Sequence, residues 1–255
     1  MKAPARIKHI TKWIKDYATK NKIKTLVVGI SGGIDSAVVS TLCAETGLPT
    51  VVLSMPIKQR KDLHNLSLKQ GQFLTKKYKN VNHLTIDLTP TFRAFEKAFG
   101  DKNTSLLAFA NSRARLRMAT LYQVAQSQSG IVVGTGNKVE DFGVGFYTKY
   151  GDGGVDISPI GDCLKTEVWE MGALLGVPQE IIDAPPTDGL WDDGRTDQDQ
   201  LGGISYADLE KAMSYDELGV KPTTNKDKET LKKYRAIRAK TVHKMMPIPV
   251  CKVTK

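Results

Sequence analysis

A short apolar run that ends near a glycine and leads directly into a helical pattern constrains the fold of this chain more than any other feature. The run Lys24–Ile30 (KTLVVGI) is rich in β-branched residues, as is typical of a strand buried on both faces of a parallel sheet. After Ser31–Gly33, apolar residues recur at helical spacing: Ile34, Val38, Val39, Leu42 and Cys43. Gly47 and Pro49 end that helix. The pattern predicts a strand–loop–helix unit of an α/β fold.

Strand and helix patterns continue to alternate up to residue 150. Apolar runs at 50–54, 81–87 and 131–133 predict strands, and the segments 62–79, 92–98 and 106–126 predict helices. Such alternation predicts a Rossmann-like open parallel sheet with helices on both faces. Ligands of such sheets bind at the carboxyl ends of the strands, where the glycine-containing stretches 29–33 and 134–136 lie.

After residue 150 the pattern is less regular. We expect helices over 164–176, 206–213 and 227–240, whereas 178–203 is a long acidic stretch with little periodicity, typical of a functional loop. Residues 1–20 predict an amphipathic helix with these apolar positions: Ile7, Ile10, Trp13, Ile14 and Tyr17. Neither an internal repeat nor a low-complexity linker divides the sequence, so we expect one domain over residues 1–255.

The formal net charge of +10 predicts a polyanionic partner: nucleic acid, an anionic membrane or a phosphorylated small molecule. The lysines are spread along the chain without a nucleic-acid-binding module, so we expect no nucleic acid. No run approaches the roughly 20 apolar residues that cross a bilayer, and the N-terminus lacks the apolar core of a secretory signal. Cys43, Cys163 and Cys251 form no CxxC pair, which argues against a disulfide framework or a zinc site and favours the reducing cytoplasm.

The loop SGGIDS at 31–36 has the composition of a phosphate-binding site. Gly32 and Gly33 can adopt backbone angles closed to other residues, and the free amides of the next helix favour an anion. The hydroxyls of Ser31 and Ser36 add donors. Neither GxxxxGK[ST] nor GxGxxG is present, which excludes a Walker A loop and a dinucleotide fingerprint. The carboxylate of Asp35 indicates a bridging Mg²⁺, or alternatively only stabilises the first helical turn.

This string resembles the PP-loop of the ATP pyrophosphatase superfamily, whose members split ATP between its α and β phosphates and adenylylate a substrate. Later segments resemble the ammonia-dependent NAD synthetases of that superfamily: 113–118 (RARLRM), 134–140 (GTGNKVE), 147–154 (YTKYGDGG), 184–190 (APPTDGL) and 201–206 (LGGISY). The resemblance runs from about Ile23 to Pro249. It departs from the family pattern at Ser54–Pro56, where many relatives have an arginine before Leu-Pro, so we expect different adenine contacts there.

The resemblance implies roles for individual residues. ATP and its phosphates would contact Gly29, Ser31, Gly32, Gly33, Asp35, Ser36, Thr135, Lys165 and Thr187. The substrate would contact Arg115, Lys149, Asp152, Asp156, His243 and Lys244, with the two aspartates near its nicotinoyl end. Mg²⁺ would bind Asp35 and Glu140, and the residues acting in catalysis would be Asp35, Lys165 and Asp152.

Several of these residues have simpler alternatives. Lys165 could be a solvated residue at a helix start, because most lysines are exposed. Glu140 could be a surface carboxylate, and His243 a packed C-terminal histidine. Arg113, Arg115 and Arg117 alternate along one predicted helix, so they cannot all face one ligand.

The implied reaction joins the nicotinate carboxylate of deamido-NAD to the α-phosphate of ATP, and ammonia then displaces AMP to give NAD. Glutamine-using relatives carry an added amidase domain, for which the segment before the PP-loop leaves no room. We therefore expect the nitrogen donor to be free ammonia or ammonia from a separate partner. The resemblance also implies a homodimer. The alternatives are another PP-loop ligase or tRNA-modifying enzyme, and a nucleotide-binding regulator without catalysis.

Overall fold

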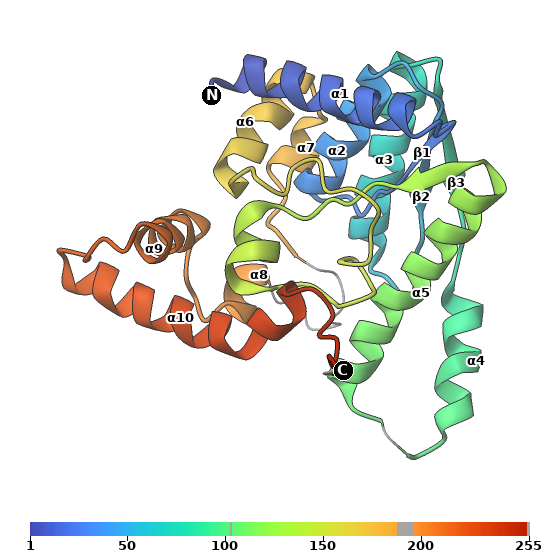
Figure 1. The fold of residues 1–255 in the computed structure, drawn as a ribbon. Helices are drawn as coiled ribbons and strands as arrows, with labels where there is room; N and C mark the ends of the chain where they lie inside the picture. The colour runs from blue at the N-terminus through green and yellow to red at the C-terminus, as the bar shows by residue number, and fades with distance from the viewer. Residues whose placement is uncertain (103, 188–195, 254–255) are drawn as a thin grey trace.

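The computed structural model describes residues 1–102, 104–187 and 196–253. Its strands are β1 (Thr25–Gly29), β2 (Thr50–Ser54), β3 (Val81–Thr85) and β4 (Gly130–Val132). Its longer helices are α1 (Ala3–Lys20), α2 (Ile34–Glu45), α3 (Lys61–Lys77), α4 (Thr89–Phe99), α5 (Leu106–Ser127), α6 (Lys165–Leu175), α9 (Tyr206–Leu218) and α10 (Asn225–Met245). A π-helical segment, η1, spans Lys138–Val144, and α7 (Gln179–Ile182) and α8 (Asp197–Gln200) are single turns (Figure 1).

The strands form one parallel sheet in the order β3-β2-β1-β4. The chain moves outward from β1 through β2 to β3 and then returns to the other side of β1 with β4. In open parallel sheets such a reversal leaves a crevice at the carboxyl ends of the two central strands, where ligands bind. Val27 pairs with Val51 of β2 and with Val132 of β4, so the loops that follow β1 and β4 emerge side by side.

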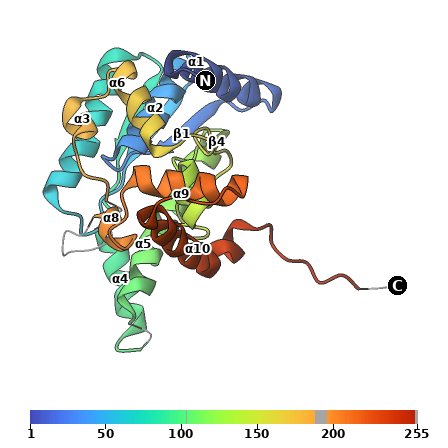
Figure 2. The same ribbon diagram turned by 90° about the vertical axis from the view of Figure 1, so that its left-hand side faces the viewer.

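Helices cover both faces of this sheet (Figure 1 and Figure 2). On one face Val28 and Val52 pack against apolar side chains of α1, α2 and α6. On the other face Val27 and Leu53 pack against α4 and α5. Residues 26–28 of β1 are at most 1 % exposed, because successive side chains enter opposite cores. This double burial is why the strand appears in the sequence as a continuous apolar run.

Helices α9 and α10 form a pair that projects from the sheet region beside η1 (Figure 1). Their apolar sides meet Val139 and Val144 of η1 in a cluster separate from the two sheet cores. Both helices begin at a hydroxyl cap: Ser205 accepts the amide three residues on at 3.2 Å, and Thr224 does the same at 3.1 Å. The predicted single domain over residues 1–255 stays a prediction.

The predicted fold class is confirmed, and most predicted elements lie close to their expected positions. The two C-terminal helices are longer than predicted, since 206–213 extends to Leu218 and 227–240 widens to Asn225–Met245. The extra turns are largely polar and carry little apolar periodicity, while Gly219, with φ of 65°, ends α9. The stretch 178–203 contains α7 and α8, and its residues 188–195 lie outside the described residues.

The amphipathic helix α1 is confirmed, but its apolar face is narrower than predicted. Ile10 and Ile14 are buried in the core, whereas Trp13 is 41 % exposed and Tyr17 is 36 % exposed. These two rings lie 5.9 Å apart and contact each other at the surface instead. None of the described helices is long and apolar enough to span a membrane.

Candidate active site

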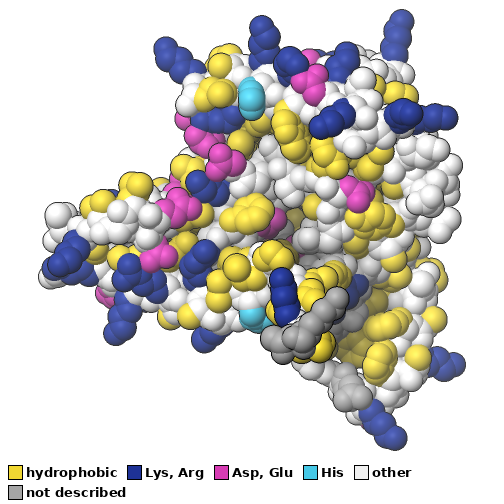
Figure 3. All heavy atoms as spheres, viewed as in Figure 1, with side chains coloured by type: hydrophobic (Ala, Val, Ile, Leu, Met, Phe, Trp, Pro, Cys, Tyr) yellow, Lys and Arg dark blue, Asp and Glu magenta, His cyan; other side chains and the backbone are white. Residues whose placement is uncertain are grey.

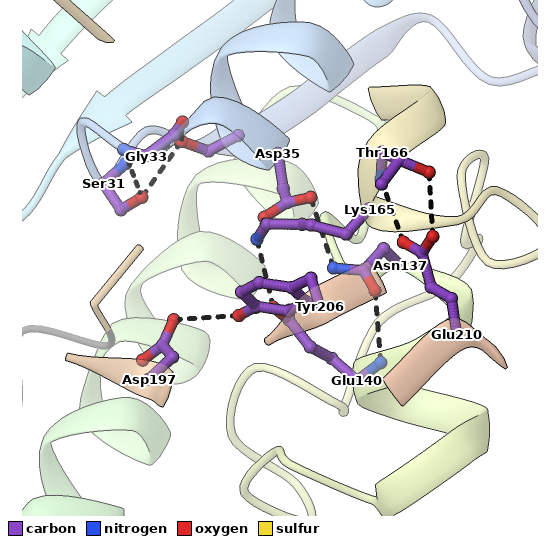
Figure 4. Close-up of polar contacts among 11 residues, drawn as sticks. Ser31, Gly33, Asp35, Asn137, Glu140, Lys165, Thr166, Asp197, Tyr206 and Glu210 are labelled. Atoms are coloured by element: carbon purple, nitrogen blue, oxygen red, sulfur yellow. Dashed lines mark hydrogen bonds and ion pairs between the residues drawn. The ribbon is translucent and has the colours of Figure 1, made fainter. Parts of the chain in front are cut away.

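The glycine loop after β1 is held in shape by its own two serines (Figure 4). The Ser36 hydroxyl accepts the N–H of Ser31 at 3.1 Å and donates to the carbonyl of Gly33 at 3.0 Å. The Ser31 hydroxyl lies 3.0 Å from that of Ser36 and accepts the N–H of Gly33 at 3.1 Å. Helix α2 begins directly after Gly33 without a side-chain cap, so its first amides can bind an anion.

The two glycines of the loop serve different purposes. Gly32 has φ of 94°, and a Cβ there would lie 2.8 Å from the Leu63 carbonyl oxygen and 2.9 Å from the Leu66 Cβ of α3. Only glycine fits this close approach. Gly33 has φ of −88°, which other residues adopt readily, so the expectation of an unusual backbone is wrong for this position. Its missing side chain instead leaves the start of α2 open.

Asp35, in the first turn of α2, belongs to a cluster of side chains that come from three other parts of the chain (Figure 4). The ammonium of Lys165 donates to Asp35 and, at 3.0 Å, to Glu140 of η1. Asn137 donates its amide to Asp35 at 3.3 Å and accepts the N–H of Glu140 at 3.1 Å. The Tyr206 hydroxyl donates to Glu140 at 2.5 Å. We call these five residues the carboxylate–lysine cluster.

The cluster is largely removed from solvent, since the side chains of Lys165, Glu140 and Asp35 are 3 %, 14 % and 17 % exposed. Burial alone would lower the pKa of Lys165, but the carboxylates of Asp35 and Glu140 hold that pKa above its usual value. Lys165 is therefore a charged, buried group. The alternatives of a solvated Lys165 and a surface Glu140 are wrong.

A second pair of acids, Asp141 and Asp152, lies beside the cluster. Burial and the nearby carboxylate of Asp152 raise the pKa of Asp141 well above its usual range. One oxygen of Asp152 accepts the N–H of Thr148 at 3.0 Å. Its side chain is exposed, and partial desolvation by the surrounding chain raises its pKa.

The end of α10 is fastened to this region through Lys244. Its ammonium donates to the carbonyl of Tyr147 at 2.5 Å, and the Tyr147 hydroxyl donates to the carbonyl of Lys244 at 2.7 Å. Burial lowers the pKa of Lys244, while the charges of Asp152 and Asp141 oppose that shift. Lys244 thus lies within electrostatic reach of Asp152. His243 is exposed, so the alternative of a packed histidine is wrong.

The three arginines of α5 contact different groups, as the alternation predicted. Arg115 donates to the carbonyl of Lys149 at 3.2 Å, which places these two predicted substrate residues together. Arg117 donates to the carbonyl of Met55 at the end of β2, at 3.0 Å. The guanidinium of Arg113 lies 5.4 Å from the centre of an aromatic ring of α4.

Asp156 lies at the edge of the sheet. Its carboxylate accepts the N–H of Val132 at 2.7 Å and the hydroxyl of Tyr122 at 3.0 Å, so it extends the hydrogen bonding of β4. Any substrate contact would use its remaining lone pairs. Thr135 follows β4 at the carboxyl edge of the sheet, and Thr187 is half-buried at the end of a described segment.

Comparison with known proteins agrees with this geometry. The family model described as NAD synthase matches residues 6–248. The NH(3)-dependent NAD(+) synthetase of Mesoplasma florum is 40 % identical over 210 residues, which cover 81 % of this chain and 82 % of that protein. That of Alkaliphilus metalliredigens is 37 % identical over 258 residues, covering 98 % and 99 %. The chain belongs to the NAD synthase family. Like these relatives it is a ligase that forms a carbon–nitrogen bond, as the sequence predicted.

Among solved structures, the NMN synthetase from Francisella tularensis is similar along the whole chain. It superposes with a TM-score of 0.87 at 32 % identity and covers 99 % of this chain and 100 % of its own. This similarity confirms the predicted fold, and it supports the family assignment by structure as well as by sequence.

The predicted site residues omitted two members of the cluster. Asn137 is fully buried and bridges Asp35 to η1, and Tyr206 holds Glu140 from α9. Both lie inside strings that resembled the family, 134–140 and 201–206, so a signal for them was present. Nothing in the local pattern indicated that Tyr206 would reach a carboxylate 66 residues away.

Proposed function

We propose that this chain uses ATP to convert the nicotinate carboxylate of deamido-NAD into the amide of NAD, with ammonia as the nitrogen donor and AMP and pyrophosphate as the other products. The observation that carries the proposal is the convergence of an open glycine loop with a buried carboxylate–lysine cluster at the switch point of a parallel sheet. A triphosphate on the loop would meet a cation at its edge.

ATP binding follows from the geometry of the loop. The serine hydroxyls already hold the backbone in place, so little ordering remains when phosphates arrive. The backbone from Gly29 to Gly33 and the first amides of α2 would face the phosphates, with Ser31 and Ser36 shaping the loop. Thr135 and Thr187 would approach the nucleotide from the carboxyl side of β4 and the segment beyond α7.

Mg²⁺ fits the cluster chemically. Asp35 and Glu140 already share one cation, the Lys165 ammonium, and carboxylate oxygens are the ligands that Mg²⁺ prefers. Within residues 1–102, 104–187 and 196–253 no three acidic, histidine or cysteine side chains form a ready metal cage. This fits Mg²⁺, which takes one or two carboxylates together with substrate phosphates and water. The bound ion would neutralise charge on the phosphates.

The remaining chemistry needs positioning rather than a protein nucleophile. The nicotinate carboxylate attacks the α-phosphate and pyrophosphate leaves, and ammonia then attacks the activated carbonyl and releases AMP. Lys165 would stabilise charge on the leaving pyrophosphate. Asp152, fixed by Thr148, would orient the nicotinoyl end, with Asp156 behind it on the sheet edge.

The dinucleotide would be bound by basic residues near Asp152. Arg115 and Lys149 are already in contact, and Lys244 is anchored over the loop that carries Asp152. His243 is exposed one residue earlier and is free to close on substrate. We expect substitutions of these residues to raise KM for the dinucleotide more than they lower kcat, because they bind parts remote from the reacting carbonyl.

The proposal includes a homodimer acting in the cytoplasm. Hydrophobic side chains lie exposed along α4 and at the start of α5: Phe95, Phe99, Leu106 and Leu107, the third at 76 % exposure (Figure 3). An apolar patch of this kind on one arm of a molecule favours a protein partner, and a second copy is the simplest one. Sedimentation equilibrium tests this: a monomer at micromolar concentration would contradict the proposal.

A second candidate substrate is nicotinic acid mononucleotide. The Francisella tularensis structure with TM-score 0.87 is that of an NMN synthetase, and amidation of the mononucleotide is the same reaction at the same carboxylate. The two substrates differ only in the distal AMP half. The ratio of kcat/KM for deamido-NAD and for the mononucleotide decides between them.

A PP-loop enzyme of another family, such as a tRNA-modifying enzyme, is disfavoured by the family match over residues 6–248. A regulator without catalysis is disfavoured, because Asp35, Glu140 and Lys165 are retained and meet in one buried cluster. The direct test incubates the protein with ATP, Mg²⁺, deamido-NAD and ammonium and separates the products. Equal amounts of NAD, AMP and pyrophosphate support the proposal; ADP and phosphate in place of AMP and pyrophosphate refute it.

A further inference from the structure

Lys165 occupies an unusual place for a lysine. It is the first residue of α6, and its side chain turns inward between Asp35 and Glu140, where it is 3 % exposed (Figure 4). Its ammonium also lies 5.0 Å from the ring centre of Tyr206 and 5.8 Å from that of Trp169. Two carboxylates and two aromatic faces therefore surround one cation.

The surroundings explain why a positive charge is stable there. Without it, the carboxylates of Asp35 and Glu140 would face each other in a poorly hydrated region, with Asp141 close by. Two buried like charges are costly unless a cation stands between them. The aromatic faces add to the attraction for a cation. The position therefore selects for positive charge rather than for lysine in particular.

From this arrangement we propose that Lys165 fills the place of the divalent cation in the nucleotide-free protein, so that the metal enters only when ATP phosphates draw the ammonium away. The inference rests on the proposed use of ATP and Mg²⁺. Lys165 and the metal would need the same two carboxylates, and a doubly charged ion and an ammonium cannot both lie between them.

The phosphate loop provides the place to which Lys165 moves. Asp35 is two residues after Gly33, so phosphates on the loop lie next to the carboxylate that Lys165 contacts. A lysine has a flexible four-carbon stem and is readily reoriented toward a new anion. Asp35 and Glu140 stay in place when it leaves. Asn137 donates to the carboxylate of Asp35 and accepts the backbone N–H of Glu140, and the Tyr206 hydroxyl donates to the carboxylate of Glu140.

A thermodynamic consequence follows. If Lys165 competes with the metal, the free protein binds metal weakly, and ATP and metal bind cooperatively. The coupling is reciprocal, so each ligand strengthens the other by the same factor, and typical coupling factors are about 5- to 150-fold. Magnesium would then be taken up with ATP and released with the products.

The test measures Mn²⁺ binding by electron paramagnetic resonance, with α,β-methylene-ATP as a nucleotide that cannot be cleaved. Wild-type protein should bind Mn²⁺ weakly alone and at least about tenfold more tightly with the nucleotide, within the usual range of coupling. Lys165→Met should bind Mn²⁺ at least about tenfold more tightly than wild type without nucleotide. Lys165→Met that binds free Mn²⁺ no more tightly than wild type would overturn the inference.

The matched control is Lys138→Met. Lys138 lies on η1, as Glu140 does, but it pairs with Asp162 at 3.2 Å and with Glu217 at 3.6 Å, away from the cluster. Both variants remove one positive charge, so a gain in Mn²⁺ affinity common to both would be a net-charge effect and would refute the role of Lys165.

A measurement on unaltered protein keeps the inference testable if Lys165→Met does not fold. Mn²⁺ alone should hardly raise Tm, whereas Mn²⁺ with α,β-methylene-ATP should raise it clearly. An equal rise with Mn²⁺ alone would refute the inference. Neither assay requires deamido-NAD or turnover, so a protein that amidates another substrate can still pass them, and a functioning NAD synthetase can fail them.

Discussion

Gly32→Ala tests whether α3 shapes the phosphate loop. Gly32 has φ of 94°, and an added Cβ would lie 2.8 Å from the Leu63 carbonyl oxygen, 2.9 Å from the Leu66 Cβ and 3.0 Å from the Ser67 nitrogen. Two of these three atoms are backbone, which cannot rotate away. The variant must therefore either push α3 outward or change the path of the loop.

The magnitude has two parts. Holding alanine at this φ costs about 1–3 kcal/mol, and the overlap with α3 adds about 1–3 kcal/mol, typical of overpacking. Gly47→Ala isolates the first part, because Gly47 has φ of 75° but open space around the position of a Cβ. The difference between the two variants in free energy of unfolding should therefore be about 1–3 kcal/mol.

Urea unfolding of both variants and of wild type measures that difference in free energy of unfolding. Calorimetric titration with α,β-methylene-ATP measures the nucleotide affinity of the loop. We expect Gly32→Ala to lose nucleotide affinity by about tenfold or more, equivalent to about 1.4 kcal/mol, while Gly47→Ala binds as wild type does. Equal stabilities of the two variants, together with unchanged nucleotide affinity of Gly32→Ala, would show that the contact with α3 does not shape the loop.

Three further perturbations follow from the site. Asp35→Ala should abolish NAD formation. It should also lower the free energy of unfolding by about 1–3 kcal/mol, because it leaves Lys165 buried with one fewer partner. An unchanged stability in urea would contradict the buried ion pair. Tyr206→Phe removes one hydrogen bond to Glu140 and should cost about 1 kcal/mol of stability. The variant should also need more Mg²⁺ in the activity assay. A Mg²⁺ dependence equal to that of wild type would show that Tyr206 does not contribute to the metal site. Burial, with the charge of His64, lowers the pKa of His83, whose ring bonds to the Ser54 hydroxyl at 2.8 Å. The stability that this neutral histidine contributes is present above its unfolded pKa of about 6.5 and is lost as pH falls through its lower folded pKa. His83→Gln should therefore lose less stability than wild type as pH falls below about 6.5. Identical pH profiles would refute the role of His83.

The sheet was predictable because its physical cause is local. Strand β1 is buried on both faces, and this requirement leaves a continuous apolar run in the sequence. The fold class then followed from the alternation of such runs with helical patterns. The order of the strands did not follow from patterns alone, because pairing of β4 beside β1 depends on contacts distant in sequence.

The phosphate loop was also predictable, because glycines, serines and a helix start lie next to one another in the chain. The carboxylate–lysine cluster was only partly predictable from the sequence. Lys165 alone is indistinguishable from a surface lysine, and its burial is set by Asp35, 130 residues away. Asn137 and Tyr206 carry no charge that would single them out. Only the packing of η1 brings Asn137 to Asp35, and only the packing of α9 brings Tyr206 to Glu140.

The exposed faces were the hardest to predict. Periodicity places Trp13 and Tyr17 with Ile10 and Ile14, yet only the isoleucines enter the core. A helical pattern indicates which side chains share a face, but the width of the buried stripe depends on what packs against it. The ends of α9 and α10 show the converse. They are polar and lack apolar periodicity, yet they are helical, because caps and the packing of the two helices against each other stabilise them.

The distance in sequence between the members of the cluster bears on how the protein acquires its activity during folding. Asp35 meets Asn137 across 102 residues and Lys165 across 130 residues, so the site closes only after β4 has joined β1 and α6 has docked. Contacts of such separation form late, because the chain must first lose the entropy of closing long loops. Intermediates that lack β4 would hold the glycine loop without its partner charges. Metal-dependent nucleotide binding would then appear only in the last folding phase, and it would distinguish fully assembled molecules from those whose first three strands alone have formed.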